Sequence, residues 1–314
     1  MSIITRYIGS LNAMNFPQTK KANVCVDNGE RNAVFMVNLY HAPVLSDHDF
    51  GLMRSPGPGL GNLLFPIGRA LIGQANWGGT FVEPTIRQIK IGTFLRNEPD
   101  KRTYGRVFKH RGMHDWRARF TSSLTNSVSE SDWTTDLQRG VTVKYSGLKN
   151  YFHDLSGYEG IIKEYLLARR RAPRISKKPY DIAVHIRLGD FAAYTPKAKS
   201  ESMRQPMDWY DAALRLGCKT WSIADPKIVV FSDAPDDDDV KRFAESWSAE
   251  IDQSANALEA IMYLGQAKGL VASRSTFSMW GAFLSGCPAI WPEEFDLGTY
   301  WTIRPNLDSY LASV

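Results

Sequence analysis

Arg187 is the residue of this sequence whose type and position best suit chemistry on an anionic substrate. It follows the apolar run Ile182–Ile186, and such a run predicts a buried strand. Ligands of open α/β sheets lie beyond the carboxyl ends of strands, which is where Arg187 stands. Its guanidinium combines a fixed charge with a planar set of donors that fits phosphate oxygens. The alternative is a structural ion pair with Asp190. His185 alternates with Arg187 along the strand, so both are expected on one side.

Hydroxyl groups precede an apolar helix in the segment SRSTFSMWG, residues 273–281. Ser275 or Thr276 can cap this helix. The free N–H groups of its first turn, together with the helix dipole, would form a site for an anion such as phosphate. The alternative is a cap that binds only its own backbone.

Asp233 ends a second apolar strand, Ile228–Phe231, after Ser232. Its carboxylate could accept a hydrogen bond from a ribose or a guanine edge, or it could simply shape a turn. The acidic run Asp236–Asp239 is interpreted as a solvated first helical turn. It is not expected to bind a metal, because four consecutive side chains point around a helix axis and cannot converge on one ion.

Glycines punctuate the segment Gly57–Asn62, sequence GPGLGN, ahead of helical spacing at Leu63–Gln74. A glycine-rich turn of this kind lets the backbone approach a ligand closely. Its spacing is not the GxGxxG of dinucleotide sites, so a purely structural turn is the alternative.

Strands and helices alternate through the second part of the chain, which predicts a doubly wound parallel sheet. The first part gives only scattered strand signals, such as Ala33–Leu39. The basic, proline-containing segment Ala168–Tyr180 predicts a boundary between two lobes. Beyond the strands already named, the predicted elements are strands at Leu270–Ala272 and Ala289–Trp291 and helices at Trp209–Leu216, Val240–Trp247 (opened by Pro235), Leu258–Gln266 and Phe277–Leu284.

Composition limits the class of protein. The 314 residues suffice for two domains, and 43% hydrophobic with 23% charged residues is typical of a globular chain and not of a disordered or fibrous one.

The net charge of +5 suits a phosphate-bearing ligand, an anionic membrane surface or nucleic acid. Basic residues near the boundary lack interleaved aromatics, so no nucleic-acid partner is expected. Cys25, Cys218 and Cys287 lack metal spacing and predict reduced thiols, and no apolar run approaches the about 20 residues that span a bilayer.

Taken in order, these segments resemble the α-1,2-fucosyltransferases, which form glycosyltransferase family 11. The family's HxRxGD signature matches His185, Arg187, Gly189 and Asp190. Similar to other family segments are the glycine turn Gly59–Phe65, the tyrosine-rich Tyr145–Phe152, the strand end Phe231–Asp233 and the STFS block Ser275–Ala282. The sequence differs at Leu63, Arg274 and Met279, where the family has glutamine, asparagine and tryptophan.

The resemblance implies a GT-B-like α/β fold of two Rossmann-like lobes with the nucleotide-sugar site in the cleft. Residues 1–170 would form the acceptor-side lobe and residues 171–314 the GDP-sugar-binding lobe, whose last residues pack back on the first. The implied activity is inverting transfer of L-fucose from GDP-β-L-fucose to the 2-hydroxyl of a galactoside in bacterial polysaccharide synthesis. The implied partners are a GDP-sugar donor and a galactose-containing glycan, with no metal and no further cofactor. The expected location is cytoplasmic, with peripheral contact to the inner membrane left open.

By this resemblance Arg187 would hold the β-phosphate and stabilise the leaving group. Asp190 is the nominal general base, although no carboxylate is singled out by spacing. Two alternatives stay open: a transferase for a different GDP-sugar, and a catalytically idle protein that binds a sugar or nucleotide. The expected donor-binding residues are Gly61, Asn62, His185, Asp233, Arg274, Ser275, Thr276 and Phe277.

Overall fold

The computed structural model describes residues 39–88, 103–105, 107–109, 113–134, 140–171, 179–188, 204–252, 256–292 and 302–303. The predicted strand Ala33–Leu39 lies outside the described residues except for Leu39, the first residue of β1. Residues 189 and 190 also lie outside, so Asp190 remains a prediction from the sequence. In the predicted boundary segment, Ala168 and Arg169 end helix α5, and residues 172–178 lie outside the described part.

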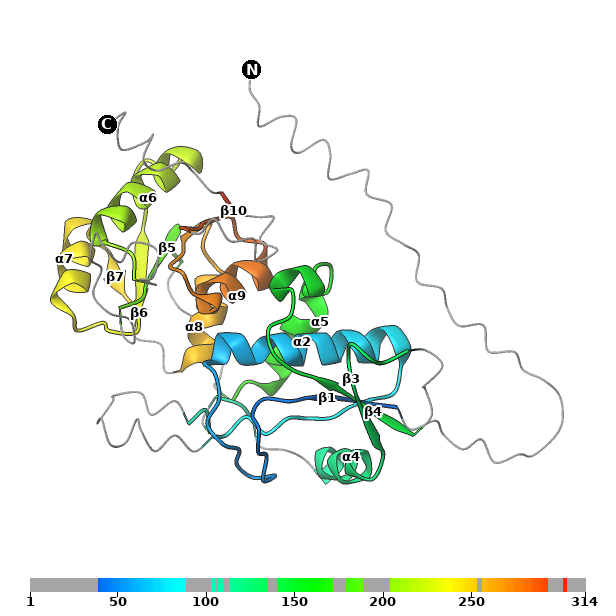
Figure 1. Ribbon diagram of the computed structural model, residues 1–314. Coiled ribbons are helices and arrows are strands. Elements are labelled where there is room, and N and C mark those ends of the chain that lie inside the picture. Colours follow the sequence, from blue (N-terminus) through cyan, green and yellow to red (C-terminus); the bar gives the residue numbers. More distant parts are fainter. Residues whose placement is uncertain are drawn as a thin grey trace, which may run out of the picture. The chain divides into compact units, whose positions relative to one another are not determined.

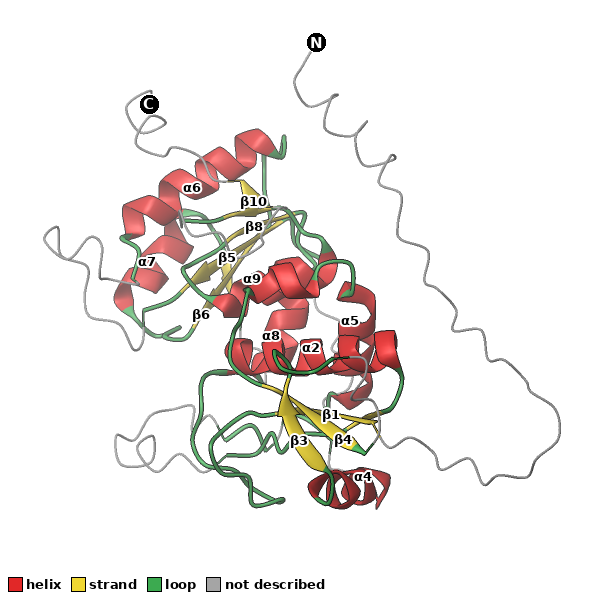
Figure 2. Cartoon of the chain, turned by 45° about the vertical axis from the view of Figure 1, so that its right-hand side comes forward, coloured by secondary structure: helices red, strands yellow, loops and turns green. Residues whose placement is uncertain are grey.

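The first sheet contains four parallel strands in the order β2-β1-β4-β3 (Figure 1). Helix α2 lies on one face of this sheet and α4 on the other (Figures 1 and 2). The strands are β1 (Leu39–Pro43), β2 (Thr80–Phe81), β3 (Asn126–Ser129) and β4 (Val141–Tyr145), and the helices are α2 (Leu60–Trp77), α4 (Met113–Ser123), the short 3-10 helix η2 (Tyr151–Leu155) and α5 (Glu159–Arg169).

The predicted helix Leu63–Gln74 is confirmed as the middle of α2, which begins three residues earlier, at Leu60. Gly59 is its N-cap and is still extended, with φ −63° and ψ 163°. The glycine-rich segment therefore supplies both the turn and the first helical residues. Apolar residues fill most of the helix, which explains why much of its length is buried.

The second sheet contains six parallel strands in the order β10-β9-β8-β5-β6-β7. The four predicted strands are confirmed, within two residues at each end. The strands are β5 (Ile182–Ile186), β6 (Ile228–Ser232), β7 (Glu250–Ile251), β8 (Gly269–Val271), β9 (Ala289–Ile290) and β10 (Thr302–Ile303), and the helices are α6 (Met207–Thr220), α7 (Asp238–Ser246), α8 (Ala257–Leu264) and α9 (Thr276–Ser285).

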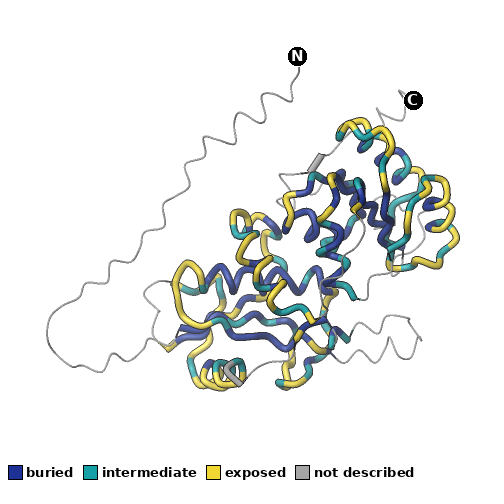
Figure 3. Tube along the Cα trace, turned by 180° about the vertical axis from the view of Figure 1, so that it is seen from behind, coloured by how far each residue is buried: buried dark blue, intermediate teal, exposed yellow. Residues whose placement is uncertain are grey.

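Helices cover both faces of the second sheet, so the doubly wound prediction is confirmed. Ile182, Val184 and Ile186 of β5 pack with residues of α6 and α7. Ala183, on the other face, belongs to the core that includes α8 and α9. Buried residues accordingly follow both sheets and the helices packed on them (Figure 3).

One prediction about α7 is wrong: Pro235 does not lie in its first turn. The helix begins at Asp238, because the carboxylate of Asp237 accepts a hydrogen bond from the Asp239 N–H at 2.9 Å and makes Asp237 the N-cap. The acidic residues therefore surround a helix start, as expected. Among the residues that the structure describes, no group of three or more His, Cys, Asp or Glu side chains could hold a metal ion.

Aromatic rings join helices from the two halves of the chain. Phe65 of α2 lies 4.9 Å from the ring of Phe152 in η2 and 5.0 Å from that of Trp280 in α9. Phe152 and Trp280 lie 5.1 Å apart. These rings belong to one continuous core that extends from α2 and α5 to α8 and α9.

Candidate active site

The strand order of the second sheet reverses between β5 and β8. From β5 the chain continues to β6 and β7 on one side, and it returns to β8, β9 and β10 on the other. The helices that come next after β5 and β8, α6 and α9, pack on opposite faces of the sheet. A crevice at the carboxyl ends of two such strands is where doubly wound sheets bind ligands. Arg187 follows β5 and Ser273–Ser275 follow β8, so these predicted site residues stand at the carboxyl ends of adjacent parallel strands.

His185, in β5, contacts the segment that follows β8 and the start of α9. Its Nδ1 lies 2.7 Å from the Ser273 hydroxyl, and its ring stacks on Phe277 with centroids 5.4 Å apart. Burial, with a smaller effect from the Arg187 charge, lowers the pKa of His185 to about 3. The imidazole is therefore neutral near pH 7 and serves as a fixed hydrogen-bonding group.

Arg187 stands directly after β5 and is partly exposed. The next residue, Leu188, donates its backbone N–H to Oδ1 of Asp233 at 2.9 Å, which fastens the chain after β5 to the end of β6. The Asp233 carboxylate therefore accepts a hydrogen bond from the protein backbone. The sequence left open whether this residue contacts a nucleoside or shapes a turn.

The start of α9 follows the predicted capping pattern. Ser275 is the N-cap, because its hydroxyl accepts a hydrogen bond from the Phe277 N–H at 3.3 Å. Its own N–H is turned back to the Ser273 carbonyl at 2.6 Å. Arg274, between these two serines, is partly exposed. The cap is confirmed; the binding of an anion at this helix start stays a prediction.

The first turn of α2 lies against the first turn of α9. The Thr276 hydroxyl donates to Oδ1 of Asn62 at 2.7 Å, and the Trp280 indole N–H donates to the Gly61 carbonyl at 2.6 Å. A Cβ on Gly61 would lie 2.8 Å from the Thr276 hydroxyl and 2.9 Å from the Phe277 nitrogen. Only glycine allows this approach. Two helix N-termini, each with partial positive charge, thus lie together, and an anion would relieve their repulsion.

Arg54, which the sequence analysis did not single out, is a further candidate residue of the site because it lies against the glycine-rich turn. It is fully buried below the glycine-rich turn, where Nη1 donates to the Ser55 carbonyl at 3.2 Å and a Cβ on Gly57 would lie 2.6 Å away. Burial lowers its pKa to about 10, so it stays charged near pH 7. Tyr104 supports the same turn, since its hydroxyl accepts from the Leu60 N–H at 3.0 Å. No sequence signal distinguishes a buried arginine from an exposed one here.

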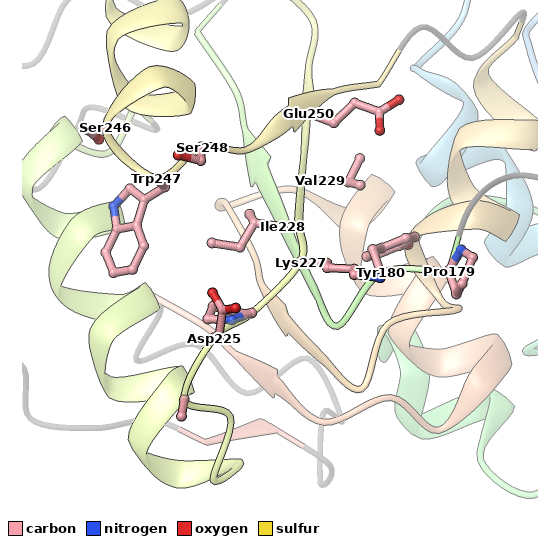
Figure 4. Close-up of a pocket in the computed structure, with 12 residues that line it drawn as sticks. Pro179, Tyr180, Asp225, Lys227, Ile228, Val229, Ser246, Trp247, Ser248 and Glu250 are labelled. Carbon is pink, nitrogen blue, oxygen red and sulfur yellow. The ribbon is translucent and has the colours of Figure 1, made fainter.

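A pocket of about 750 Å³ lies at the amino ends of the strands of the second sheet, opposite the carboxyl ends where the predicted site residues stand (Figure 4). Its lining includes Tyr180 before β5, Lys227 before β6 and Glu250 at the start of β7. These positions are at the amino ends of the strands, and none of the predicted site residues lines this pocket. The strand carboxyl ends therefore remain the better candidate for the active site. In the described part of the chain, no helix has the length and apolar character needed to cross a membrane.

Comparison with known proteins supports a glycosyltransferase. Residues 168–294 match the model of glycosyl transferase family 11, which confirms the resemblance over strands β5 to β9 of the second sheet. The matched region contains His185, Arg187, Asp233 and the start of α9 but not the first turn of α2. A search of curated proteins found no match. A similar solved structure is E. coli heptosyltransferase WaaC with ADP-2-deoxy-2-fluoro heptose, with 12% identity, 88% of this chain and 99% of that chain covered, and a TM-score of 0.41.

Proposed function

Proceeding from the family 11 match of residues 168–294, we propose that this chain is an inverting glycosyltransferase that uses GDP-β-L-fucose. The acceptor is the 2-hydroxyl of a galactoside in a glycan, within bacterial polysaccharide synthesis. A cytoplasmic location is part of this proposal. The observation that carries it is the contact of His185, two residues before Arg187, with Ser273 and Phe277 at the start of α9, where the strand order reverses between β5 and β8.

The reaction breaks the bond between the anomeric carbon of fucose and a β-phosphate oxygen of GDP. An oxocarbenium-like transition state develops, and negative charge accumulates on the departing diphosphate. The main catalytic need is therefore stabilisation of that charge by preorganised donors. Arg187 and the first-turn N–H groups of α9 supply such donors. The acceptor hydroxyl attacks the opposite face, which inverts the β-linked fucose to an α-fucoside, and its proton passes to a base for which Asp190 is the candidate.

The remaining residues position these groups. Neutral His185 holds Ser273 by a hydrogen bond and Phe277 by stacking, and so links the end of β5, two residues before Arg187, to the start of α9. Asn62 and Gly61 hold α2 against the same helix start. We propose that the diphosphate binds beside these contacts, with Asp233 near the nucleoside and Arg274 adding charge near the phosphates. No metal takes part in this proposal.

The test is a transfer assay with separated donor and acceptor panels. Donor turnover is measured with GDP-fucose, GDP-mannose and UDP-galactose, each with and without β-galactosides, and the product linkage is read by NMR. An α-1,2-linked fucoside from GDP-fucose alone supports the proposal. Turnover of another GDP-sugar in place of GDP-fucose would reassign the donor. Calorimetric GDP binding without turnover of any donor would indicate an idle binding protein.

A further inference from the structure

Asp233 makes a hydrogen bond to the segment that carries Arg187. Its Oδ1 accepts from the backbone N–H of Leu188 at 2.9 Å. Ile186 and Ser232 form the last pair between β5 and β6. The bond therefore lies just beyond the point where the parallel ladder ends, and a side-chain oxygen takes the place of a backbone acceptor there. The ends of the two strands stay joined through the residue next to Arg187.

This bond restrains the backbone of Arg187 on its second side. The Leu188 N–H belongs to the planar peptide unit that follows the Arg187 Cα atom. Pairing of β5 with β6 holds the chain before Arg187, and the Asp233 carboxylate holds the peptide unit after it. The direction in which the arginine side chain leaves the backbone is therefore set from both sides.

The alternation of side chains shows which direction this is. Every second residue from Ile182 to Leu188 belongs to the core on the α6 and α7 face of the second sheet. The period of two thus continues past the end of β5, and Arg187 projects from the opposite face. On that face His185, two residues earlier, contacts the start of α9. The Arg187 side chain and the α9 N-terminus therefore lie on the same side of the sheet.

The turn after β6 has hydrogen bonds of its own. The Ser232 hydroxyl accepts from the Ala234 N–H at 3.1 Å, and the Ala234 carbonyl accepts from the Asp237 N–H at 3.1 Å. Oδ1 of Asp233 instead accepts from the neighbouring strand end. Formation of the turn does not account for this bond, and its effect falls on the chain around Arg187.

We infer that Asp233 is a positioning residue for Arg187: its carboxylate holds the Leu188 amide and thereby directs the guanidinium to the face where α9 begins. This inference rests on the proposed function, because it takes Arg187 as the group that binds the β-phosphate. The nucleoside can lie near Asp233 without a bond to it. A nucleoside contact would strengthen the binding of every guanine nucleotide, whereas positioning of Arg187 strengthens only the binding of those with a β-phosphate.

The experiment compares the affinities for GDP and GMP, which differ in the β-phosphate. Isothermal titration calorimetry of the parent protein and of Arg187→Ala gives the part of the GDP affinity that depends on Arg187. Asp233→Ala removes the acceptor and should lower the ratio of GDP to GMP affinity about tenfold, with the GMP affinity unchanged. Asp233→Asn keeps an oxygen that can accept from the Leu188 N–H and should retain most of the parent ratio.

A double variant tests whether the two residues act as a unit. In the Arg187→Ala background, Asp233→Ala should lower the ratio no further, because no guanidinium is left to position. The matched control is Asp236→Ala, which removes a carboxylate of the same acidic segment whose side chain is 99% exposed, and it should keep the parent ratio. Urea denaturation shows that each variant is folded before its affinities are compared.

Three outcomes would overturn the inference. One is an equal loss of GDP and GMP affinity in folded Asp233→Ala, because the carboxylate would then contact the nucleoside. Another is an unchanged ratio in Asp233→Ala or in Arg187→Ala. A third is independent losses that multiply in the double variant. A parent protein that shows the expected ratios but turns over no donor would contradict the proposed function alone, since the ratios depend only on binding.

Discussion

Thr276 donates its hydroxyl hydrogen to Oδ1 of Asn62 at 2.7 Å, although the two residues are 214 positions apart in the chain. This bond joins the first turns of α9 and α2, with Gly61 in contact between them. The glycine-rich turn and the STFS block are separate motifs in the sequence, and in the structure they are in direct contact.

Replacing Thr276 by valine keeps the shape of the side chain and removes this donor. We expect the free energy of unfolding to fall by about 1 kcal/mol, because the Asn62 oxygen loses its partner. A double-mutant cycle with Asn62→Ala, in which urea denaturation gives the free energy of unfolding of each variant, measures the coupling between the two side chains. Strictly additive effects would contradict the role assigned to the bond.

Gly61→Ala should be more harmful than either polar change. The added Cβ would stand 2.8 Å from the Thr276 hydroxyl and 2.9 Å from the Phe277 nitrogen, so the two helices must separate. We expect a loss of about 1–3 kcal/mol of stability, as in other overpacked sites. Gly160→Ala on α5, where a Cβ meets nothing within 4 Å, is the control. Equal melting temperatures for the two variants would argue against the close approach.

Arg187→Ala should lower kcat about a hundredfold, which corresponds to roughly 3 kcal/mol of transition-state stabilisation. Arg187→Lys keeps the charge without the planar donor set and should recover only part of this rate. Arg242→Ala, at an exposed position of α7, is the matched control and should retain normal turnover. Near-normal activity of folded Arg187→Ala would exclude the proposed role.

Protonation of His185 should oppose folding at acidic pH. Its folded-state pKa of about 3 lies below its usual value of 6.5, because burial disfavours the imidazolium ion. The unfolded chain therefore binds one more proton between these values, and stability is lost as pH falls through this window. For one proton, the free energy of unfolding falls by about 1.4 kcal/mol for each pH unit within this window. Urea titrations from pH 7 to pH 4 should show a shallower loss for His185→Gln than for the parent protein.

Arg54→Met tests the cost of a buried charge. Within the described part of the chain, Nε and Nη2 of Arg54 have no hydrogen-bond partner, whereas Nη1 has two carbonyl acceptors. We expect the methionine variant to be more stable by on the order of 1 kcal/mol, since burial of a charge with incomplete hydrogen bonding is costly. Thermal unfolding measures the difference. A loss of several kcal/mol would mean that the bonds to Leu45 and Ser55 outweigh this cost.

Sequence predicts the second lobe well because its strands are continuous apolar runs. The predicted strand Ile182–Ile186 has the same first and last residue as β5. The Ser275 cap could also be predicted, because it depends on one hydrogen bond between residues close in the sequence. Strands β7 and β10 were missed, since two residues carry no periodicity. The reversal between β5 and β8 depends on a pairing of Ile182 with Gly269, far apart in the chain, which no local pattern encodes. The contact of Asn62 with Thr276 and the burial of Arg54 are likewise products of long-range packing.

The ring contacts among Phe65, Phe152 and Trp280 limit how this enzyme can be engineered. Each half of the chain supplies part of that aromatic cluster, so a fragment that begins near residue 171 would expose Trp280 and Phe283 to water. A chimera that takes its second half from another glycosyltransferase must therefore carry matching residues on α2 and η2. Without them, the recombinant protein would be prone to aggregate before its donor preference could be assayed.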